Sequence, residues 1–377
     1  MEILGYNAIS AAGRTSEELL SALLKGAPCS QKALDGGFIC PIPKSSEKEM
    51  TTVRERLGLY LQENWDRVRP TLPSEISDRL NSGARVAFVF ASTKGIIEDF
   101  IWTDASDGRE APDPFSAVID DFLSKEASLN WVLSCGLSNA CSSTHVALEY
   151  VQELFEQDRM DFAFLFAADL VGPFISQGFQ SLKLVSPTGS RPFGENRDGL
   201  QLGEGAALFL LAKNGEFSRG LRLTHVRSET EGSSITRPSQ NGDGLFRALK
   251  SLEAGSLPDL VIAHGTGTVF NDQAEDQALR QLAASGGLDP KTPVTNTKWC
   301  LGHTLGASGA MDLAAGCEIL KRQKVFRIES TDRPDPKLTM NYLMADRPLP
   351  AGPIRKILIS SLGFGGVHAG LSLEKTK

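Results

Sequence analysis

The sequence lacks paired cysteines, runs of basic residues and long apolar stretches. Its six cysteines include no Cys-x-x-Cys pair, so we expect neither a disulfide framework nor a metal site, and a reducing compartment is indicated. Acidic residues outnumber basic ones by 46 to 39, and with a net charge of −7 nucleic acid is not an expected partner. The most apolar run, residues 161–174, is interrupted by Asp169 and is shorter than the roughly 20 residues of a membrane span. No signal-peptide pattern opens the chain, so we expect a soluble, cytoplasmic protein without a membrane partner.

The sequence is rich in glycine and contains several strand-like segments. The chain contains 36 glycines in 377 residues, a length that suggests two or three units of about 150 residues each. Segments with helical character separate apolar, strand-like runs, which lie at residues 85–92, 131–138, 161–169, 259–268 and 355–366. This alternation predicts an α/β protein with buried sheets.

Two segments of the chain resemble each other. Residues 202–213 read LGEGAALFLLAK and residues 362–375 read LGFGGVHAGLSLEK, so both have Leu-Gly-x-Gly before a strand-like tail. Each closes a part of the chain that opens with a short strand, which suggests two similar halves, residues 1–212 and 213–377. Gly-x-Gly turns before strands are common, however, so this repetition alone leaves duplication open.

The first stretch that can carry chemistry reads LSNACSSTHVALEYVQELF and runs from Leu137 to Phe155. It places Cys141 among small residues where a strand ends and a helix begins, and the N–H groups and dipole of a helix start favour a thiolate. A buried, inert cysteine is the alternative for any isolated Cys. His145 is expected to pack against a neighbouring element, because a ring on the same helix points away from the substrate's entrance.

A second stretch, VIAHGTGTVFNDQAEDQAL, delivers a histidine from an apolar strand into a glycine-rich loop. The histidine is His264, with the hydroxyls of Thr266 and Thr268 beside it. Asp272 and Glu275 are expected to cap the helix that follows. A histidine that ends a buried strand can also be purely structural.

A third stretch, TNTKWCLGHTLGASGAMDLAAG, places Lys298 and His303 in a glycine-rich loop before an apolar helix. Asp312 is the acid of that helix and can pair with Lys298; the alternative for the lysine is a solvated surface position. A fourth stretch, ISSLGFGGVHAGL, puts Phe364 between glycines after a buried strand, where it can be a gate or a core residue. Together, one cysteine, two histidines, a lysine and a Gly-Phe-Gly turn are an uncommon combination.

With these motifs the chain resembles the β-ketoacyl-acyl-carrier-protein synthases, the elongating condensing enzymes of fatty-acid and polyketide synthesis. The motifs that carry the resemblance are NACSSTHVAL, AHGTGTVFND, NTKWCLGHTLGASGA, SSLGFGGVHAGL and SPTGSRPFGENRDGLQLGEGAALFLL. The resemblance runs from residue 3 to the C-terminus. It implies the thiolase fold, which has five layers (α-β-α-β-α) built from two similar halves and is usually dimeric, as a homodimer or with a related subunit.

The resemblance also implies a reaction. Cys141 would take an acyl group from the phosphopantetheine arm of one acyl carrier protein. Malonyl-carrier protein would then lose CO₂, and its enolate would attack the thioester in a Claisen condensation. No metal or redox cofactor is implied.

Each motif residue acquires a role from the resemblance. His264 and His303 would stabilise the enolate, and the backbone N–H groups of Cys141 and Phe364 would form a second oxyanion hole. Lys298 would orient the histidine loop through Asp312. The hydroxyls of Thr266 and Thr268 would bind the pantetheine arm, and the ring of Phe364 would gate the acyl pocket.

Three departures from the family pattern stand out. Asp312 replaces the usual glutamate, so its contact with the lysine is expected to be longer or water-bridged. Val367 and His368 stand where relatives have Thr-Asn, which changes the hydrogen bonding behind the gate. Lys94 falls near the expected acyl pocket, which leads to the hypothesis of an unsaturated or aryl-capped polyene substrate.

Two other readings stay open. A chain-length-factor type of subunit usually lacks the cysteine that this chain has. A Cys-His hydrolase would leave the second histidine and the lysine without roles. Because the chain is acidic, an acidic carrier protein would need a local basic patch, for which Arg54, Arg56 and Lys183 are candidates.

Overall fold

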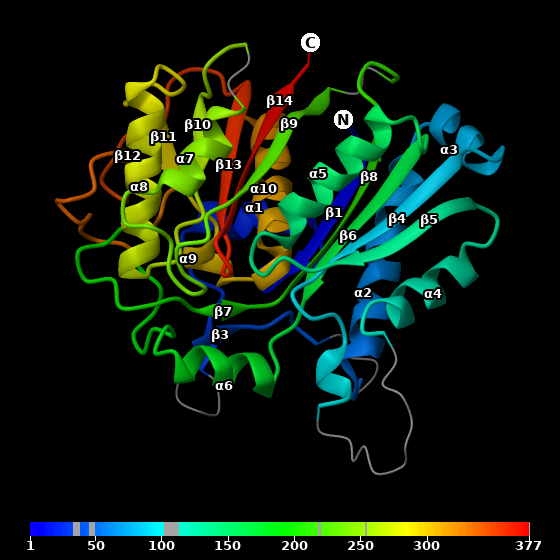
Figure 1. Cartoon of the computed structure of the whole chain (residues 1–377), viewed down its shortest axis with the longest axis horizontal. Coiled ribbons are helices and arrows are strands. Elements are labelled where there is room, and N and C mark those ends of the chain that lie inside the picture. Colours follow the sequence, from blue (N-terminus) through cyan, green and yellow to red (C-terminus); the bar gives the residue numbers. More distant parts are fainter. Residues whose placement is uncertain (33–37, 45–49, 102–112, 218–219, 253–254, 377) are drawn as a thin grey trace.

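A computed structural model describes residues 1–32, 38–44, 50–101, 113–217, 220–252 and 255–376 (Figure 1). Its strands are β1 (Glu2–Ser10), β2 (Gln31–Lys32), β3 (Phe38–Cys40), β4 (Arg85–Ala91), β5 (Asn130–Leu137), β6 (Phe162–Asp169), β7 (Leu202–Gly203), β8 (Gly205–Ala212), β9 (Leu221–Thr230), β10 (Leu260–Ile262), β11 (Pro293–Thr295), β12 (Asn341–Tyr342), β13 (Lys356–Leu362) and β14 (Val367–Lys375). Its α-helices are α1 (Ser16–Lys25), α2 (Val53–Val68), α3 (Ser74–Asn81), α4 (Ser116–Lys125), α5 (Ser143–Glu156), α6 (Pro173–Ser181), α7 (Asp243–Lys250), α8 (Val269–Ala284), α9 (Lys298–Leu301) and α10 (Ser308–Arg322). Short 3-10 turns are η1 (Arg69–Thr71), η2 (Ile97–Asp99) and η4 (Leu305–Ala307).

The strands of the two halves follow the same order. In the N-terminal half β1 pairs with β8, followed by β6, β4 and β5; in the C-terminal half β9 pairs with β14, followed by β13, β10 and β11. In both halves the first two pairings are antiparallel and the next two are parallel. The halves meet where Glu2 of β1 pairs with Arg222 of β9. This shared order confirms two similar halves; their division at residue 213 stays a prediction.

Helices separate and cover the strands of the two halves. α5 contacts β4 and β6 on one side and β9 and β14 on the other, and α10 likewise contacts strands of both halves. These two helices therefore form a central layer. α2 and α4 cover the outer face of the N-terminal half, and α7 and α8 cover that of the C-terminal half (Figure 1). The result is the expected α-β-α-β-α arrangement.

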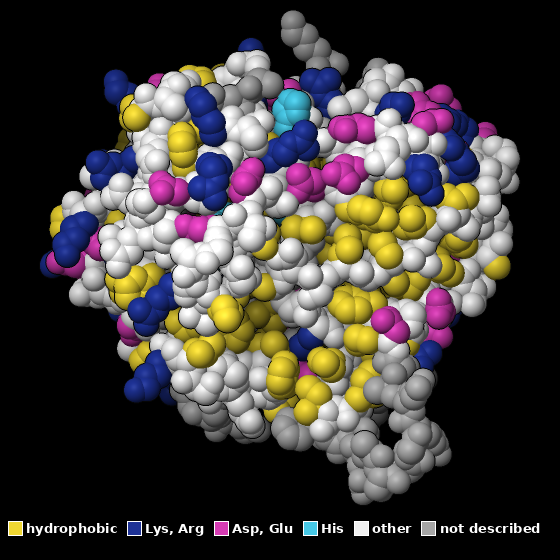
Figure 2. Space-filling model, in the orientation of Figure 1, with side chains coloured by type: hydrophobic (Ala, Val, Ile, Leu, Met, Phe, Trp, Pro, Cys, Tyr) yellow, Lys and Arg dark blue, Asp and Glu magenta, His cyan; other side chains and the backbone are white. Residues whose placement is uncertain are grey.

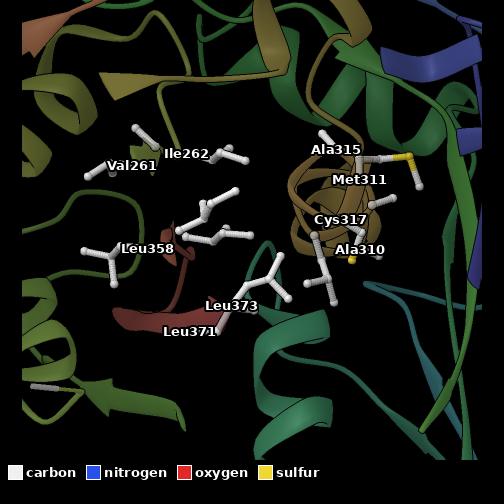
Figure 3. Close-up of a cluster of buried hydrophobic side chains, with 14 of the residues drawn as sticks. Val261, Ile262, Ala310, Met311, Ala315, Cys317, Leu358, Leu371 and Leu373 are labelled. Carbon is white, nitrogen blue, oxygen red and sulfur yellow. The ribbon is translucent and has the colours of Figure 1, made fainter. Parts of the chain in front are cut away.

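α10 is buried on all sides except at its last two residues, Lys321 and Arg322, which are exposed. Every residue from Ser308 to Leu320 is buried. Figure 3 shows side chains of α10 facing those of β10, β13 and β14. Gly316 permits this approach, because a Cβ there would lie 3.0 Å from Cδ2 of Leu373. Small residues thus let α10 pack close to the strands.

The strands also determine where the chemistry-bearing residues lie. Cys141 follows the carboxyl end of β5, His264 that of β10, Lys298 that of β11 and Phe364 that of β13. Residues after the carboxyl ends of parallel strands lie at one edge of a sheet, which is where α/β proteins place their ligands. The central helices join the two halves so that these edges face a common cavity, described next.

Candidate active site

Cys141 lies in a tight turn between β5 and α5. Ala140 has a φ of 44°, a left-handed conformation that costs a residue with a Cβ about 1–2 kcal/mol. Ser143 holds the turn: its hydroxyl donates to the carbonyl of Ala140 at 2.7 Å and accepts the N–H of Asn139 at 2.8 Å. The turn presents the Cys141 thiol to the cavity while leaving it only 5% exposed.

His303 is in direct contact with the cysteine. Its Nε2 lies 3.1 Å from Sγ of Cys141, and its Nδ1 lies 3.3 Å from the hydroxyl of Ser308. The backbone of His303 is fixed by its N–H, which donates to Gln201 at 2.6 Å, and by its carbonyl, which accepts from Gly203 at 2.9 Å. Because a hydroxyl both donates and accepts, Ser308 is compatible with either tautomer of the ring.

His264 lies beside His303, with ring centroids 5.2 Å apart and ring planes perpendicular. Glu275 holds the His264 loop: its carboxylate accepts the N–H groups of His264 at 2.7 Å and Gly265 at 2.8 Å, and the hydroxyl of Ser360 at 2.6 Å. Within the described residues Nδ1 of His264 has no hydrogen-bond partner. A buried N–H without a partner is rarer than a buried acceptor without one, which favours the tautomer with Nε2–H.

The loop after His264 depends on glycine. Gly265 and Gly267 have φ values of 38° and 80°, and a Cβ at Gly265 would lie 2.2 Å from Nδ2 of Asn296. Asp272 accepts the N–H groups of Thr266 and Gly267 at 3.1 and 3.2 Å. The expectation that Asp272 and Glu275 cap α8 was wrong: their carboxylates turn back to hold the loop instead.

Lys298 and Asp312 form a direct ion pair. Nζ of Lys298 donates to the Asp312 carboxylate at 3.0 Å, and the hydroxyl of Thr297 donates to its other oxygen at 2.5 Å. Both side chains of the pair are almost fully buried. The surface alternative for Lys298 is therefore wrong, and so is the expected longer or water-bridged contact. The shorter Asp312 side chain reaches the lysine because both are enclosed between the β11 loop and α10.

The pKa of Cys141 does not agree with the predicted thiolate. Burial raises the pKa of the Cys141 thiol to about 11, although hydrogen bonds from the backbone N–H groups of Phe364 and Cys141 and the charge of Lys298 oppose it. Burial, with a smaller contribution from Lys298, lowers the pKa of His303 to about 3 and that of His264 well below 6.5. The resting state is thus a neutral thiol beside two neutral imidazoles. The helix start was a poor guide to the pKa of Cys141 because burial, the largest cause, outweighs the hydrogen bonds and the Lys298 charge that lower this pKa.

The three groups line one cavity of about 410 Å³. Thr266 and Thr268 share this cavity, and their hydroxyls lie 3.0 Å apart. Phe364 lines it as well and stacks on Phe179 of α6, with ring centroids 5.7 Å apart. Further lining residues are Leu182, Lys183, Leu184, Leu200, Thr236, Arg237, Pro238, Phe270, Asn271, Leu362, Gly363 and His368. The predicted site residues Cys141, His264, His303, Thr266, Thr268 and Phe364 therefore meet, with Lys298 and Asp312 directly behind them.

His145 packs as expected. It is fully buried on α5, and a Cβ at Gly309 of α10 would lie 2.5 Å from its Nδ1. Gly309 therefore leaves room for the imidazole between the two central helices. His368, one of the departures from the family pattern, donates a hydrogen bond from Nε2 to the carboxylate of Glu231 at 2.7 Å.

The hypothesis that Lys94 lies at the acyl pocket was wrong. Its Nζ is buried against the carbonyl of Leu170 at 2.8 Å and the carboxylate of Glu98 at 3.3 Å, and it does not line the cavity that holds Cys141. Lys94 therefore gives no reason to expect an unusual acyl chain. The partners that enclose it lie on other elements and could not be read from its own motif.

Two of the three suggested basic-patch residues are also misplaced. Arg56 is paired with the buried Glu204 at 2.6 Å, and Arg54 is paired with Asp121 at 2.8 Å. Lys183 does line the cavity, and so does Arg237, which sequence reasoning missed. The guanidinium of Arg237 lies 4.4 Å from the centre of the Phe270 ring. Both cations are exposed.

Asp169 is another supporting residue that sequence reasoning missed. Its carboxylate is fully buried at the end of β6 and accepts the N–H groups of Thr93 at 2.9 Å and Gly306 at 2.8 Å, and the hydroxyl of Ser92 at 2.8 Å. Gly306 lies three residues after His303. A lone acid that ends a fully buried strand was the available signal. Its carboxylate ties the two halves together behind the site.

In the part of the chain that the structure describes, no group of three or more His, Cys, Asp or Glu side chains is arranged to hold a metal ion. No helix there is both long enough and apolar enough to cross a membrane.

The fold and the Cys-His-His arrangement define a condensing-enzyme type of site, and comparison with known families agrees. Residues 132–216 match the model of the beta-ketoacyl synthase N-terminal domain, and residues 222–330 match that of the C-terminal domain. The chain belongs to the β-ketoacyl synthase family.

Named relatives include a ketoacyl synthase subunit of a polyketide synthase and a 3-oxoacyl-[acyl-carrier-protein] synthase. The tetracenomycin polyketide synthase ketoacyl synthase alpha subunit of Streptomyces glaucescens is 29% identical over 64% of this chain and 60% of its own length. The 3-oxoacyl-[acyl-carrier-protein] synthase 2 of Synechocystis sp. is 29% identical over 54% of this chain and 52% of its own. The matched part thus spans less than two thirds of these relatives.

Solved structures share the whole fold. A ketosynthase solved in complex with its chain length factor, from Xenorhabdus doucetiae, superposes with a TM-score of 0.80 and 23% identity over 99% of this chain and 97% of the other. The expected thiolase fold is confirmed.

Proposed function

We propose that this protein is a β-ketoacyl synthase that condenses an acyl group on Cys141 with a malonyl group on an acyl carrier protein. The observation that carries the proposal is the 3.1 Å contact between Nε2 of His303 and Sγ of Cys141, with His264 beside it in the same cavity. A hydrolase needs one such histidine, whereas enolate stabilisation uses two N–H donors aimed at one oxygen.

In the first half-reaction the sulfur of Cys141 attacks the carbonyl carbon of an acyl thioester, and the bond from that carbon to the pantetheine sulfur breaks. Because the resting thiol is protonated, its proton must leave as the new bond forms. Nε2 of the neutral His303 is within reach to take it and to return it to the departing sulfur. The backbone N–H groups of Cys141 and Phe364, which point at the sulfur, support the thioester oxygen.

In the second half-reaction the malonyl carboxylate leaves as CO₂, and the electron pair of the broken bond forms an enolate. His264 and His303 donate Nε2–H groups to the enolate oxygen. The enolate carbon attacks the Cys141 thioester, the carbon–sulfur bond breaks, and the Cys141 thiolate takes one proton from solvent, which replaces the proton that left with the pantetheine thiol in the first half-reaction. Ser308 accommodates the tautomer of His303 that each half-reaction requires. Burial keeps both rings neutral, and the charge of Lys298 lowers the pKa of each ring further.

The pantetheine arm would enter past Lys183 and Arg237 and contact Thr266 and Thr268. The ring of Phe364 would gate the acyl end, since glycines flank it on both sides and its stacking on Phe179 can be exchanged. These assignments rest on the lining of the cavity.

Mass spectrometry of Cys141 tests the proposal. The protein is incubated with carrier proteins bearing saturated and unsaturated acyl chains, and then with malonyl-carrier protein. We expect an acyl adduct on Cys141 that is discharged as a β-ketoacyl-carrier product with release of CO₂, and no adduct in Cys141→Ala. The His264→Ala variant should keep the adduct but lose on the order of 100-fold or more in condensation.

Other outcomes identify the rival readings. An adduct that is released as free acid, with no condensation on adding malonyl-carrier protein, would mean a hydrolase. Product formation by an assembled complex that is unchanged in Cys141→Ala would mean a chain-length-factor type of subunit.

The proposal includes a partner subunit, a second copy or a related chain, at β5. β5 ends the series of strands and pairs only with β4 among the described strands. Val132 on it is 44% exposed, and Leu133, Cys135 and Leu137 are half-buried. Figure 2 shows hydrophobic side chains gathered on this side of the molecule. A long edge strand without charged residues is a template for pairing.

Light scattering tests the partner subunit. If the chain is a homodimer, Val132→Arg should halve its mass in solution, while Leu257→Arg, a change at another exposed hydrophobic residue, should not. A chain that is already monomeric alone would instead require the related subunit. An unchanged dimer in Val132→Arg would overturn the placement at β5.

A further inference from the structure

Three cysteines that the proposed chemistry does not use meet on one side of the site. Sγ of Cys29, which follows α1, lies 3.6 Å from Sγ of Cys300 in α9. Cys40, in β3, donates its thiol hydrogen to the carbonyl of Cys300 at 3.7 Å. All are free thiols. Cys300 lies between Lys298 and His303 in the sequence, so this cluster adjoins the catalytic loop.

The backbone already holds Cys29 and Cys300 together. The N–H of Cys29 donates to the carbonyl of Cys300 at 2.9 Å, although the residues are 271 positions apart. The Cys300 sulfur also contacts the carbonyl of Ala27 at 3.5 Å. A disulfide requires the sulfurs to approach to about 2.0 Å, which rotation of two side chains on a fixed backbone can supply.

The thiols differ in reactivity. Cys29 is half-buried, whereas Cys300, Cys40 and Cys141 are buried. A hydrogen bond from Cys300 lowers the pKa of Cys29, while burial raises that of Cys141 to about 11. Oxidants react with accessible thiolates, so Cys29 is the sulfur that is attacked first.

We propose that Cys29 and Cys300 form a reversible disulfide when the protein meets a peroxide, while Cys141 stays reduced. The thiolate sulfur of Cys29 attacks one peroxide oxygen, the O–O bond breaks, and a sulfenic acid and one water (after protonation) are formed. The Cys300 thiol then attacks the sulfenic sulfur, the S–O bond breaks, and a second water leaves. Two thiols are oxidised and one peroxide is reduced to two waters. A dithiol reductant reverses the step by thiol–disulfide exchange.

The bond would link the segment after α1 to α9, which begins with Lys298. Because it closes a very long loop, it restricts the unfolded chain strongly. We expect the oxidised protein to unfold at a temperature about 4 °C higher than the reduced protein. Acyl loading of Cys141 should stay within about two-fold of the reduced protein, since the backbone hydrogen bond already fixes the geometry.

The experiment treats the full-length, reduced chain with a few equivalents of hydrogen peroxide and removes the peroxide. It then unfolds the protein in denaturant that contains N-ethylmaleimide, so that buried thiols are blocked as well, and maps peptides by mass spectrometry. We expect a cross-linked Cys29–Cys300 peptide that has lost two hydrogen atoms, four alkylated cysteines including Cys141, and recovery of six after reduction. Cys300→Ser should stop at a Cys29 sulfenic acid that dimedone traps, and Cys29→Ser should form no cross-link.

Cys40→Ser is the matched control, because it removes the neighbouring thiol and should leave the Cys29–Cys300 cross-link unchanged. Oxidation of Cys141 before Cys29, a Cys29–Cys40 cross-link in place of the proposed one, or no cross-link in a protein that retains its unfolding transition would each overturn the proposal. None of these outcomes depends on the condensation reaction, so they stand apart from the test of the proposed function.

Discussion

The carboxylate of Glu275 accepts the backbone N–H of His264 at 2.7 Å, and this contact sets the direction in which the imidazole enters the cavity. The other carboxylate oxygen accepts the N–H of Gly265 at 2.8 Å. Two oxygens therefore face two N–H donors. An amide at position 275 would oppose one of these donors with an NH₂ group.

We expect Glu275→Gln to lower the free energy of unfolding by about 2 kcal/mol, because a buried donor loses its acceptor. A shift of His264 should also slow condensation on the order of 10- to 100-fold. Acyl loading of Cys141 should change little, since His264 serves only the second half-reaction. Urea unfolding and separate loading and condensation assays measure the two effects. Glu153→Gln, an exposed change on α5, is the control; condensation equal to the wild-type rate in Glu275→Gln would contradict the assigned role.

The protonated state of Cys141 predicts how the rate of its alkylation depends on pH. Because burial raises the pKa of the thiol to about 11, only a small fraction is thiolate near neutral pH. The rate of alkylation of Cys141 by iodoacetamide should therefore rise about ten-fold per pH unit from pH 7 to 10. Mass spectrometry of the Cys141 peptide gives the rate, with Cys141→Ser to confirm the site. A rate that levels off below pH 8 would instead show the thiolate that the helix start suggested.

The buried pair of Lys298 and Asp312 gives a prediction for stability. Removing the lysine alone leaves a carboxylate enclosed without its cation, so Lys298→Met should cost about 3–5 kcal/mol. The double variant Lys298→Met/Asp312→Leu should recover most of that loss, because two apolar side chains of similar volume replace the pair. Condensation should remain impaired in the double variant, since the ion pair that orients the histidine loop is gone, and with it the charge that adds to burial in lowering the pKa of His264 and His303. Chemical unfolding of the wild type, Lys298→Met, Asp312→Leu and the double variant measures the coupling. Additive losses would contradict a direct pair.

Individual residues show which parts of the site could be predicted from the sequence. Cys141, His264, His303 and Phe364 stood in motifs whose local chemistry was readable. The strand-like runs placed Cys141, His264 and Phe364 after the end of a strand, and the glycine-rich loop before α10 held His303. What local sequence could not supply was burial and distant partners. The fraction of Cys141 present as thiolate was overestimated, because residues of both halves of the chain bury its side chain.

The same limit explains the misplaced cations. Lys94 was assigned to the acyl pocket, but the carbonyl of Leu170, 76 residues away, holds its ammonium group. Arg56 was assigned to a carrier-protein patch, but Glu204, 148 residues away, holds its guanidinium. Asp272 and Glu275 were read as helix caps because both acids lie near the start of α8. That their carboxylates accept N–H groups from the preceding loop could be seen only in the fold.

Two exposed cations at the mouth of the cavity predict how the binding of an acidic carrier protein responds to charge reversal. Lys183 and Arg237 are exposed cations that line the cavity in which Cys141 lies, whereas Arg54 is paired with Asp121 and lies outside its lining. If an acidic carrier protein docks at the mouth, Lys183→Glu/Arg237→Glu should raise its KM on the order of 10-fold at low salt, with kcat nearly unchanged. Arg54→Glu should have little effect. Because exposed charges are screened over about 8 Å at physiological ionic strength, the difference from wild type should shrink as salt is added. Steady-state condensation assays at several salt concentrations measure both constants. A KM that does not respond to the double reversal, or an increase that persists in high salt, would move the docking surface away from these two residues.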